Sequence, residues 1–206
     1  MTAEYRGSPL FFLSYAHPTS SGGQRGLAAV TEFFTELSML VADRAGLRAG
    51  EIPGFMDSSI EAGRQWNREL RRAVGTCKVF VALLSPNYFT SEWCGREWCA
   101  FARRRVTGAV GSDTAIVPVV WTPFMEDQMP SLVKDPQHFM PQDPVRVQVA
   151  ESYVEYGLNG MHYSGDSNYQ TVLWKLAGCI AKIAYDCEVE PLILESTELY
   201  NGFEEG

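Results

Sequence analysis

The sequence lacks any run of eighteen consecutive apolar residues, which is about the length that a membrane-spanning helix needs. Its first residues also lack the basic start, the apolar stretch and the small-residue cleavage site of a signal peptide. We therefore expect a cytoplasmic protein with no membrane partner. Hydrophobic residues make up 46% and charged residues 20% of the 206 residues, so length and composition suit one well-buried domain.

Positive charge is scarce. The chain has 17 lysines and arginines against 25 acidic residues, which gives a formal net charge of −8. Binding of nucleic acid requires clustered cations that neutralise phosphates, so no nucleic-acid partner is expected. The densest basic run, 103–105, ends a predicted helix, where cations suit the helix dipole.

Paired metal-ligand spacings are missing as well. Tetrahedral zinc needs clustered thiolates or imidazoles, and neither a CxxC nor an HxxxH spacing occurs here. We therefore predict no metal site. Because cytosolic thiols stay reduced, we expect the five cysteines to be small buried hydrophobes. They are Cys77, Cys94, Cys99, Cys179 and Cys187.

Short apolar runs without helical periodicity recur along the chain. Such runs are typical of strands in a parallel sheet that is covered on both faces. Pro53 removes a hydrogen-bond donor from one of them, which suits only a strand at the sheet edge or the start of a strand. The predicted strands are 10–15, 52–57, 78–84, 115–121 and a short last strand at 153–158.

Helical patterns separate these strands. Apolar residues recur at three- and four-residue steps from Leu27, and again along a closing helix over 169–185. We predict a flavodoxin-like, doubly wound α/β fold, in which helices flank five parallel strands in the order 2-1-3-4-5. The predicted organisation is a single domain over 1–187, with a Pro-rich insertion at about 122–150 and a loose acidic tail over 188–206.

Ligands of such sheets bind beyond the carboxyl ends of the strands, where the strand order reverses. In the predicted order this point lies between the first and third strands, so the segments 14–17 and 87–98 should meet there. Ser91 is a plausible N-cap of the following helix. Trp93 and Glu97 lie one turn apart on that helix, beside its core stripe, and should face the cleft. An indole next to a carboxylate suits an aromatic, cationic ligand.

Several motifs together resemble the TIR (Toll/interleukin-1 receptor) domain. The segment FFLSY at 11–15 is similar to the first strand of that family, and FMD at 55–57 with IEAG at 60–63 resembles its second strand and BB loop. The SxWCxxE spacing from Ser91 to Glu97 resembles the catalytic motif of NAD-cleaving members. The GFMD, CxVFV and IVPxxWTP segments look most like those of bacterial FxsC-type TIR-like proteins.

The resemblance implies an NAD⁺ glycohydrolase whose essential carboxylate is Glu97, with NAD⁺ as substrate and no bound cofactor. Breaking the nicotinamide–ribose bond builds positive charge on the ribose, which a nearby carboxylate stabilises. The product would be ADP-ribose or a cyclic form of it. Several NAD-cleaving relatives carry arginine where this chain has Ala16, which leaves the substrate pose open. The predicted substrate-binding residues are Ser14, Tyr15, His17, Asp57, Ser91 and Trp93.

The resemblance also implies self-association. An exposed Ile60 at a loop tip would need a cover, which fits the family habit of docking BB loops onto a neighbouring TIR domain. We expect a homo-oligomer with a site completed across the contact, and regulation by a protein acting in trans is a further option. The residues assigned to this assembly loop are Ser59, Ile60, Glu61 and Gly63.

Alternatives exist for the function and for its key residue. The chain is alternatively a non-catalytic TIR interaction module in bacterial signalling or immunity. A cysteine or serine hydrolase is least favoured, because Cys94 has no obvious base beside it and no GxSxG elbow occurs. Glu97 has a simpler interpretation as a solvated carboxylate paired with Arg96 or Arg104, and Trp93 has one as core packing.

Overall fold

Four parallel strands form the central sheet of the structure, a computed structural model that describes residues 7–17, 23–57, 68–108, 114–141 and 147–204. Each of the three neighbouring pairs is parallel. The strands are β1 (Phe11–Tyr15), β2 (Gly54–Met56), β3 (Val79–Leu84) and β5 (Ile116–Val120), in the order β2-β1-β3-β5. The α/β class, the first four predicted strands and the edge position of the second strand are confirmed.

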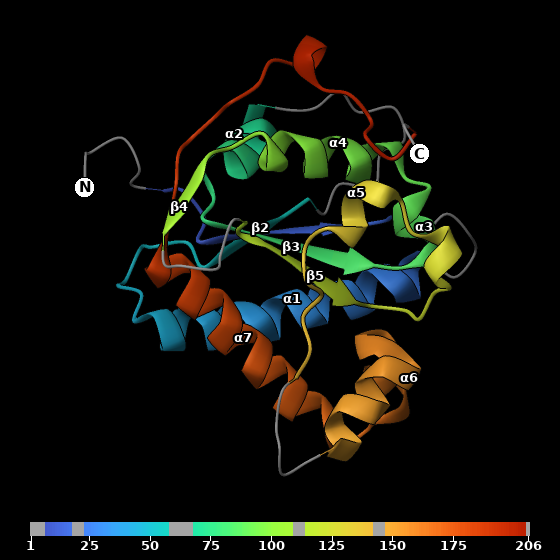
Figure 1. The fold of residues 1–206 in the computed structure, drawn as a ribbon. Coiled ribbons are helices and arrows are strands. Elements are labelled where there is room, and N and C mark those ends of the chain that lie inside the picture. The colour runs from blue at the N-terminus through green and yellow to red at the C-terminus, as the bar shows by residue number, and fades with distance from the viewer. Residues whose placement is uncertain (1–6, 18–22, 58–67, 109–113, 142–146, 205–206) are drawn as a thin grey trace.

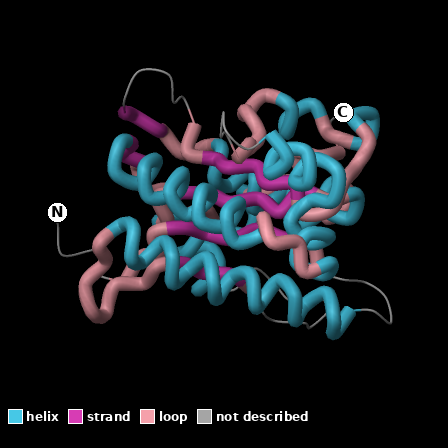
Figure 2. Tube along the Cα trace, turned by 90° about the horizontal axis from the view of Figure 1, so that it is seen from below, coloured by secondary structure: helices cyan, strands magenta, loops and turns pink. Residues whose placement is uncertain are grey.

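Helices cover both faces of this sheet (Figure 1). Viewed from below, helices lie in front of the strands (Figure 2). One face carries α2 (Arg68–Thr76), α3 (Pro86–Phe89), α4 (Glu92–Ala102) and α5 (Ser131–Lys134). The opposite face carries α1 (Gly23–Ala45), α6 (Val147–Ser164) and α7 (Tyr169–Asp186). In the part of the chain that the structure describes, no helix is both long and apolar enough to cross a membrane.

Side chains of β1 alternate between the two cores. Phe11 and Leu13 pack with α1 and α7, whereas Phe12 packs on the side of α2 and α4. Ser14 follows Phe12 by two residues and therefore points to the same side, because alternate residues of a strand share a face. Ser14 is only 1% exposed. A hydroxyl buried in this way requires a hydrogen-bonding partner, and it can find one only on the α4 side.

The predicted fifth strand at 153–158 is wrong, because these residues lie within α6. Tyr153 and Leu158 are fully buried against the core that α1 and α7 share. The helical period is broken at Gly157, which has a φ of 63°. A Cβ at this position would lie 2.6 Å from the carbonyl oxygen of Trp121, so the close approach requires glycine. Because the kink interrupts the helical period, the sequence pattern predicted a short strand here instead of a helix.

The acidic tail is not loose, which corrects a second expectation. It begins with β6 (Cys187–Val189), which pairs antiparallel with β4 (Val106–Gly108), and neither strand was predicted. The chain then crosses the outer side of α2 and α4, drawn in red in Figure 1. Arg71 forms an ion pair with Glu195 at 2.5 Å, and the ring of Phe203 lies against Tyr88. The tail ends with the 3-10 helix η3 (Ser196–Glu198) and a turn.

The Pro-rich segment after β5 contains short helical turns, as predicted. They are η2 (Glu126–Gln128) and α5. Farther along, the backbone N–H of Phe139 donates to the carbonyl of Pro118 at 2.8 Å. This contact places the segment along the outer side of β5 and satisfies one carbonyl of that strand.

Candidate functional site

Ligands of doubly wound sheets bind at the carboxyl ends of the strands where the order reverses, and in this sheet those are the ends of β1 and β3. The chain runs from β1 to β2 on one side and then returns to β3 on the other, so the order reverses between β1 and β3 as predicted. After β3, Ser85 caps the short α3 and Ser91 caps α4. The Ser91 hydroxyl accepts a hydrogen bond from the backbone N–H of Cys94 at 3.3 Å. This cap starts α4 next to the end of β1.

Glu97 is buried in the second turn of α4, with 8% of its surface exposed. The Ser14 hydroxyl donates to Glu97 Oε2 at 2.5 Å. The oxygen of Ser14 also lies 2.9 Å from the phenolic oxygen of Tyr88, which is fully buried. Side chains from β1, α3 and α4 thus form one connected hydrogen-bonded group, and the two predicted segments do meet here.

Burial changes the acidity of this carboxyl group. Loss of water raises the pKa of Glu97 from 4.5 to about 8. The hydrogen bond from Ser14 acts in the opposite direction, and the negative charge of Asp57 adds to the increase. At pH 7 the group is therefore mostly protonated in the free protein. A cation bound beside it would favour its ionised form.

The arginines considered as partners of Glu97 are engaged elsewhere. Arg96 forms an ion pair with Glu92, one turn earlier on the same helix. Arg104 is buried and donates to the carbonyl oxygens of Val74 and Cys77 at 3.0 and 2.6 Å. Glu97 thus differs from a solvated helix carboxylate in both its burial and its partner.

The end of β1 also gathers three other predicted site residues. The Tyr15 hydroxyl donates to the backbone carbonyl of Asp57 at 2.6 Å, and the ring centroids of Tyr15 and His17 are 4.8 Å apart. Burial lowers the pKa of His17, although the charge of Asp57 opposes this change. This shift favours the neutral form of the His17 ring. These residues lie at the same end of the sheet as Glu97.

Trp93 is not a core residue, because 38% of its surface is exposed. The guanidinium carbon of Arg96 lies 5.2 Å from the centroid of the indole ring. Trp93 thus offers an aromatic surface one turn before Glu97.

The predicted assembly residues Ser59, Ile60, Glu61 and Gly63 lie outside the described residues.

Cys94 does not have the properties of a nucleophile. It is 1% exposed, and burial raises the pKa of its thiol well above the usual value, with the charge of Glu97 adding to the increase. A thiol held in its neutral form is a weak nucleophile, which argues against the cysteine hydrolase.

Tyr88 is the site residue that the sequence analysis did not predict. The available signal was Ser14, because a serine in a buried strand requires hydrogen-bonding partners, and Tyr88 is one of them.

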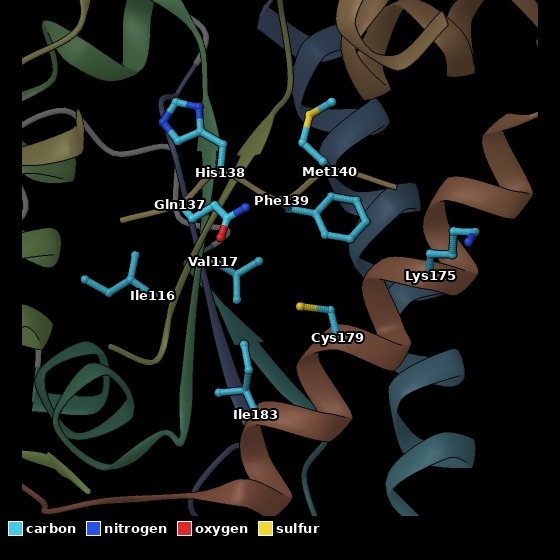
Figure 3. A pocket seen from close by; sticks show the side chains of 9 residues that line it. All are labelled: Ile116, Val117, Gln137, His138, Phe139, Met140, Lys175, Cys179 and Ile183. Atoms are coloured by element: carbon cyan, nitrogen blue, oxygen red, sulfur yellow. The ribbon is translucent and has the colours of Figure 1, made fainter. Parts of the chain in front are cut away.

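Away from this site, the described residues line at least two cavities. One of about 400 Å³ lies between β5, the segment 137–140 and α7, where Cys179 and Phe139 contribute to its walls (Figure 3). The other, of about 470 Å³, lies at the ends of α1 and α7 and includes Arg44. Neither is lined by Glu97 or Trp93, so an open cleft between these two residues stays a prediction. Among the described residues, no group of three His, Cys, Asp or Glu side chains could hold a metal ion.

Fold and site together define a class of protein: a doubly wound α/β domain with a buried carboxylate and an exposed indole at its switch point. The family model of the TIR domain matches residues 44–148, just over half of the chain, and the chain belongs to this family. The match includes α4 with Trp93 and Glu97, whereas Ser14 lies before it.

A curated relative is a probable 2' cyclic ADP-D-ribose synthase, BdTIR from Brachypodium distachyon. It is 31% identical over 119 residues, which cover 55% of this chain and 47% of the relative. This chain thus spans about half the length of that protein. Among solved structures, the TIR domains of the activated Roq1 resistosome, which recognises the pathogen effector XopQ, cover 85% of this chain and 82% of theirs. The TM-score is 0.33 at 20% identity, too low to support a structural argument.

Proposed function

We propose that this TIR domain cleaves the nicotinamide–ribose bond of NAD⁺ and that Glu97 is its catalytic carboxylate. The observation that carries the proposal is the burial of Glu97 at the switch point, where Ser14 holds it at 2.5 Å. Burial of an ionisable carboxyl group is costly for a fold, and buried groups with shifted pKa values cluster at functional sites. The name of the curated relative supports the same chemistry.

In the proposed reaction, the bond between the ribose carbon and the nicotinamide nitrogen breaks, and its electron pair goes to the nitrogen. Nicotinamide leaves as a neutral molecule, so no general acid is needed. The positive charge that develops on the ribose is stabilised by ionised Glu97 in a site of low polarity. Water then attacks the cationic ribose carbon and releases a proton to the solvent, which gives ADP-ribose. Alternatively, a hydroxyl group of the same molecule attacks this carbon and loses its proton, which gives a cyclic product.

Substrate binding would favour the reactive state of Glu97. NAD⁺ carries its positive charge on the nicotinamide ring, and the exposed Trp93 offers an aromatic face to such a cation. A cation placed near Glu97 lowers the pKa of the carboxyl group, so the substrate promotes the ionisation that catalysis requires. His17 and Asp57 would contact the rest of the substrate from the ends of β1 and β2.

Self-association belongs to the same proposal. The assembly loop around Ile60 would dock onto a second TIR domain and complete the site, so activity should rise steeply with protein concentration. A protein acting in trans would be one way to control this step. The finer resemblance to bacterial FxsC-type proteins and the cytoplasmic location of this chain both stay predictions.

The test is release of nicotinamide from NAD⁺ by concentrated protein, followed by chromatography. Glu97→Gln should lower the rate by about a hundred- to a thousand-fold, the usual loss when one preorganised electrostatic group is removed. Glu151→Gln is the matched control, because this exposed glutamate lies on α6, across the sheet from α4, and should leave the rate unchanged. Equal turnover by both variants would refute the role of Glu97. No release by the wild-type protein at any concentration would favour the non-catalytic module.

A further inference from the structure

The hydrogen-bonded group around Glu97 contains a residue with no assigned role. Tyr88 comes from α3, and its hydroxyl oxygen lies 2.9 Å from that of Ser14. Tyr88 and Ser14 are 0% and 1% exposed, so water does not compete for these bonds. Tyr88 reaches Glu97 through Ser14, whose hydroxyl lies between them.

The number of protons determines the direction of these bonds. The Ser14 hydroxyl has one proton, and it donates that proton to Glu97 Oε2. Tyr88 must then donate to the oxygen of Ser14, since two hydroxyl groups share one proton in each hydrogen bond. Burial raises the pKa of Tyr88 well above its usual value, so the phenol keeps its proton. The order is Tyr88 to Ser14 to Glu97, and bonds in such a chain strengthen one another.

The position of Tyr88 is fixed by contacts on several sides. Its backbone N–H donates to the carbonyl of Ser85 at 3.0 Å and lies 3.2 Å from the Ser85 hydroxyl, which caps α3. Its ring centroid is 6.3 Å from that of Phe89 and 5.8 Å from that of Phe203 in the tail. The phenol is therefore held in place before any ligand binds.

We propose that Tyr88 is a positioning residue that acts through the Ser14 hydroxyl to orient the Glu97 carboxyl group and to stabilise its ionised form. When Tyr88 donates to Ser14, the serine proton points at Glu97, which is the arrangement that an anion requires. When Glu97 is protonated, both bonds can reverse, so the group adapts to either state. The kinetic part of this inference rests on the proposed function, whereas the effect on Glu97 itself does not.

Other groups also act on the charge of Glu97 and stay unchanged in the test. Those facing it in the described part of the chain are Asp57 after β2, Tyr15 of β1 and Cys94 of α4. Burial raises the pKa of both Tyr15 and Cys94, so these two are neutral at working pH. Asp57 is the charged group among the three, and its effect opposes ionisation.

The decisive variant is Tyr88→Phe, which removes one oxygen and keeps the ring. The pKa of Glu97 should rise by about 0.5 to 1 unit, as expected for the loss of one buried hydrogen bond. It can be measured from the carboxyl carbon shift of protein labelled with ¹³C-glutamate. The pH profile of kcat/KM should move to higher pH by the same amount, so the lost rate returns in alkaline solution. A merely structural defect would not recover in this way.

Tyr153→Phe is the matched control. Tyr153 is equally buried, and its hydroxyl accepts a hydrogen bond from the Val120 N–H at 2.8 Å on the opposite face of the sheet. This variant should leave the titration of Glu97 unchanged. In a Ser14→Ala background, Tyr88→Phe should add no further shift, because the connection is already broken.

Two results would overturn the inference. One is a Glu97 titration in Tyr88→Phe that matches the wild type, and the other is a shift that persists fully in the Ser14→Ala background. If Tyr88→Phe does not fold, Ser14→Ala alone still tests the connection, since an unchanged Glu97 titration there contradicts it. A wild-type protein that releases no nicotinamide would refute the proposed function and leave this titration experiment valid.

Discussion

Replacing Glu97 by glutamine should make the folded protein more stable, and increasingly so as the pH rises. The carboxyl group is 8% exposed, and burial raises its pKa from 4.5 to about 8. A group whose pKa is higher in the folded state stabilises the fold in its protonated form. That contribution is complete below pH 4.5 and is lost as the pH rises through about 8. Glutamine keeps the shape and the acceptor for Ser14 and does not ionise.

The magnitude follows from the difference between the two pKa values. Each pH unit inside this window costs the wild-type protein at most about 1.4 kcal/mol of unfolding free energy. Between pH 5 and pH 8 the loss amounts to about 3–4 kcal/mol. The advantage of Glu97→Gln over the wild type should grow by this amount. For a chain of this length, 1 kcal/mol corresponds to about 2–4 °C in Tm.

Urea unfolding of both proteins at pH 5, 6, 7 and 8 measures this difference directly, provided that the transition midpoint and its slope are fitted at each pH. Glu151→Gln serves again as control, because its exposed carboxylate should give a stability curve parallel to that of the wild type. Parallel curves for Glu97→Gln as well would refute the reasoning, because Glu97 would then titrate alike in the folded and unfolded protein. A gain in stability together with a loss of turnover would identify Glu97 as a group kept for function.

Three further predictions concern turnover, the kink of α6 and the seating of the tail. The value of kcat/KM for nicotinamide release should rise with pH and reach half of its maximum near pH 8, since this ratio reports the ionisation of the free enzyme and the Glu97 pKa is about 8. A flat profile would exclude Glu97 as the carboxylate that must ionise. Gly157→Ala should lower the unfolding free energy by about 1–3 kcal/mol in urea, because the residue has a φ of 63° and faces a backbone oxygen. The control is Gly165→Ala: Gly165 also has a positive φ, of 67°, but an added Cβ would meet no atom within 4 Å, so the loss of unfolding free energy should be smaller. Equal losses for the two variants would contradict the close-contact argument. Gly95→Ala should displace the tail, because the new Cβ would lie 1.8 Å from Asn201 Oδ1. A protease should then cut the C-terminal segment faster than it does in the wild type. An unchanged rate of cleavage would mean that the tail does not depend on this contact.

The first four strands could be read from the sequence because their signal is local. Three of them, β1, β3 and β5, are short runs of apolar residues that the sheet and its helices bury on both faces, and such a run can be recognised without knowing its partner strands. The edge strand β2 is only half-buried, and its signal is weaker. The prediction for the segment 153–158 was wrong because the structure there depends on a contact between residues distant in the chain. Its Gly157 turns into the left-handed region to approach the carbonyl of Trp121, a residue distant in the chain, and no local period reveals that contact.

The tail illustrates the same limit. Its acidic composition predicts a solvated segment, yet Leu194 is buried and Phe203 lies against Trp98 and Tyr88. Two glycines, Gly95 on α4 and Gly202 in the tail, let the backbones come close enough for this packing. Composition describes an average over a segment, whereas docking depends on a few apolar residues and on the surface that they meet.

For the site, the sequence by itself determined that Ser91 caps α4 and that Trp93 and Glu97 follow it at helical spacing, because capping and helical periodicity act within a few residues. Only the tertiary structure decided the burial, the hydrogen bonding and the pKa of Glu97. Its burial, its bond to Ser14 and the presence of Tyr88 arise where β1, α3 and α4 pack together. A pKa depends on the groups and the water around a carboxyl, and these are set by the folding of the whole chain.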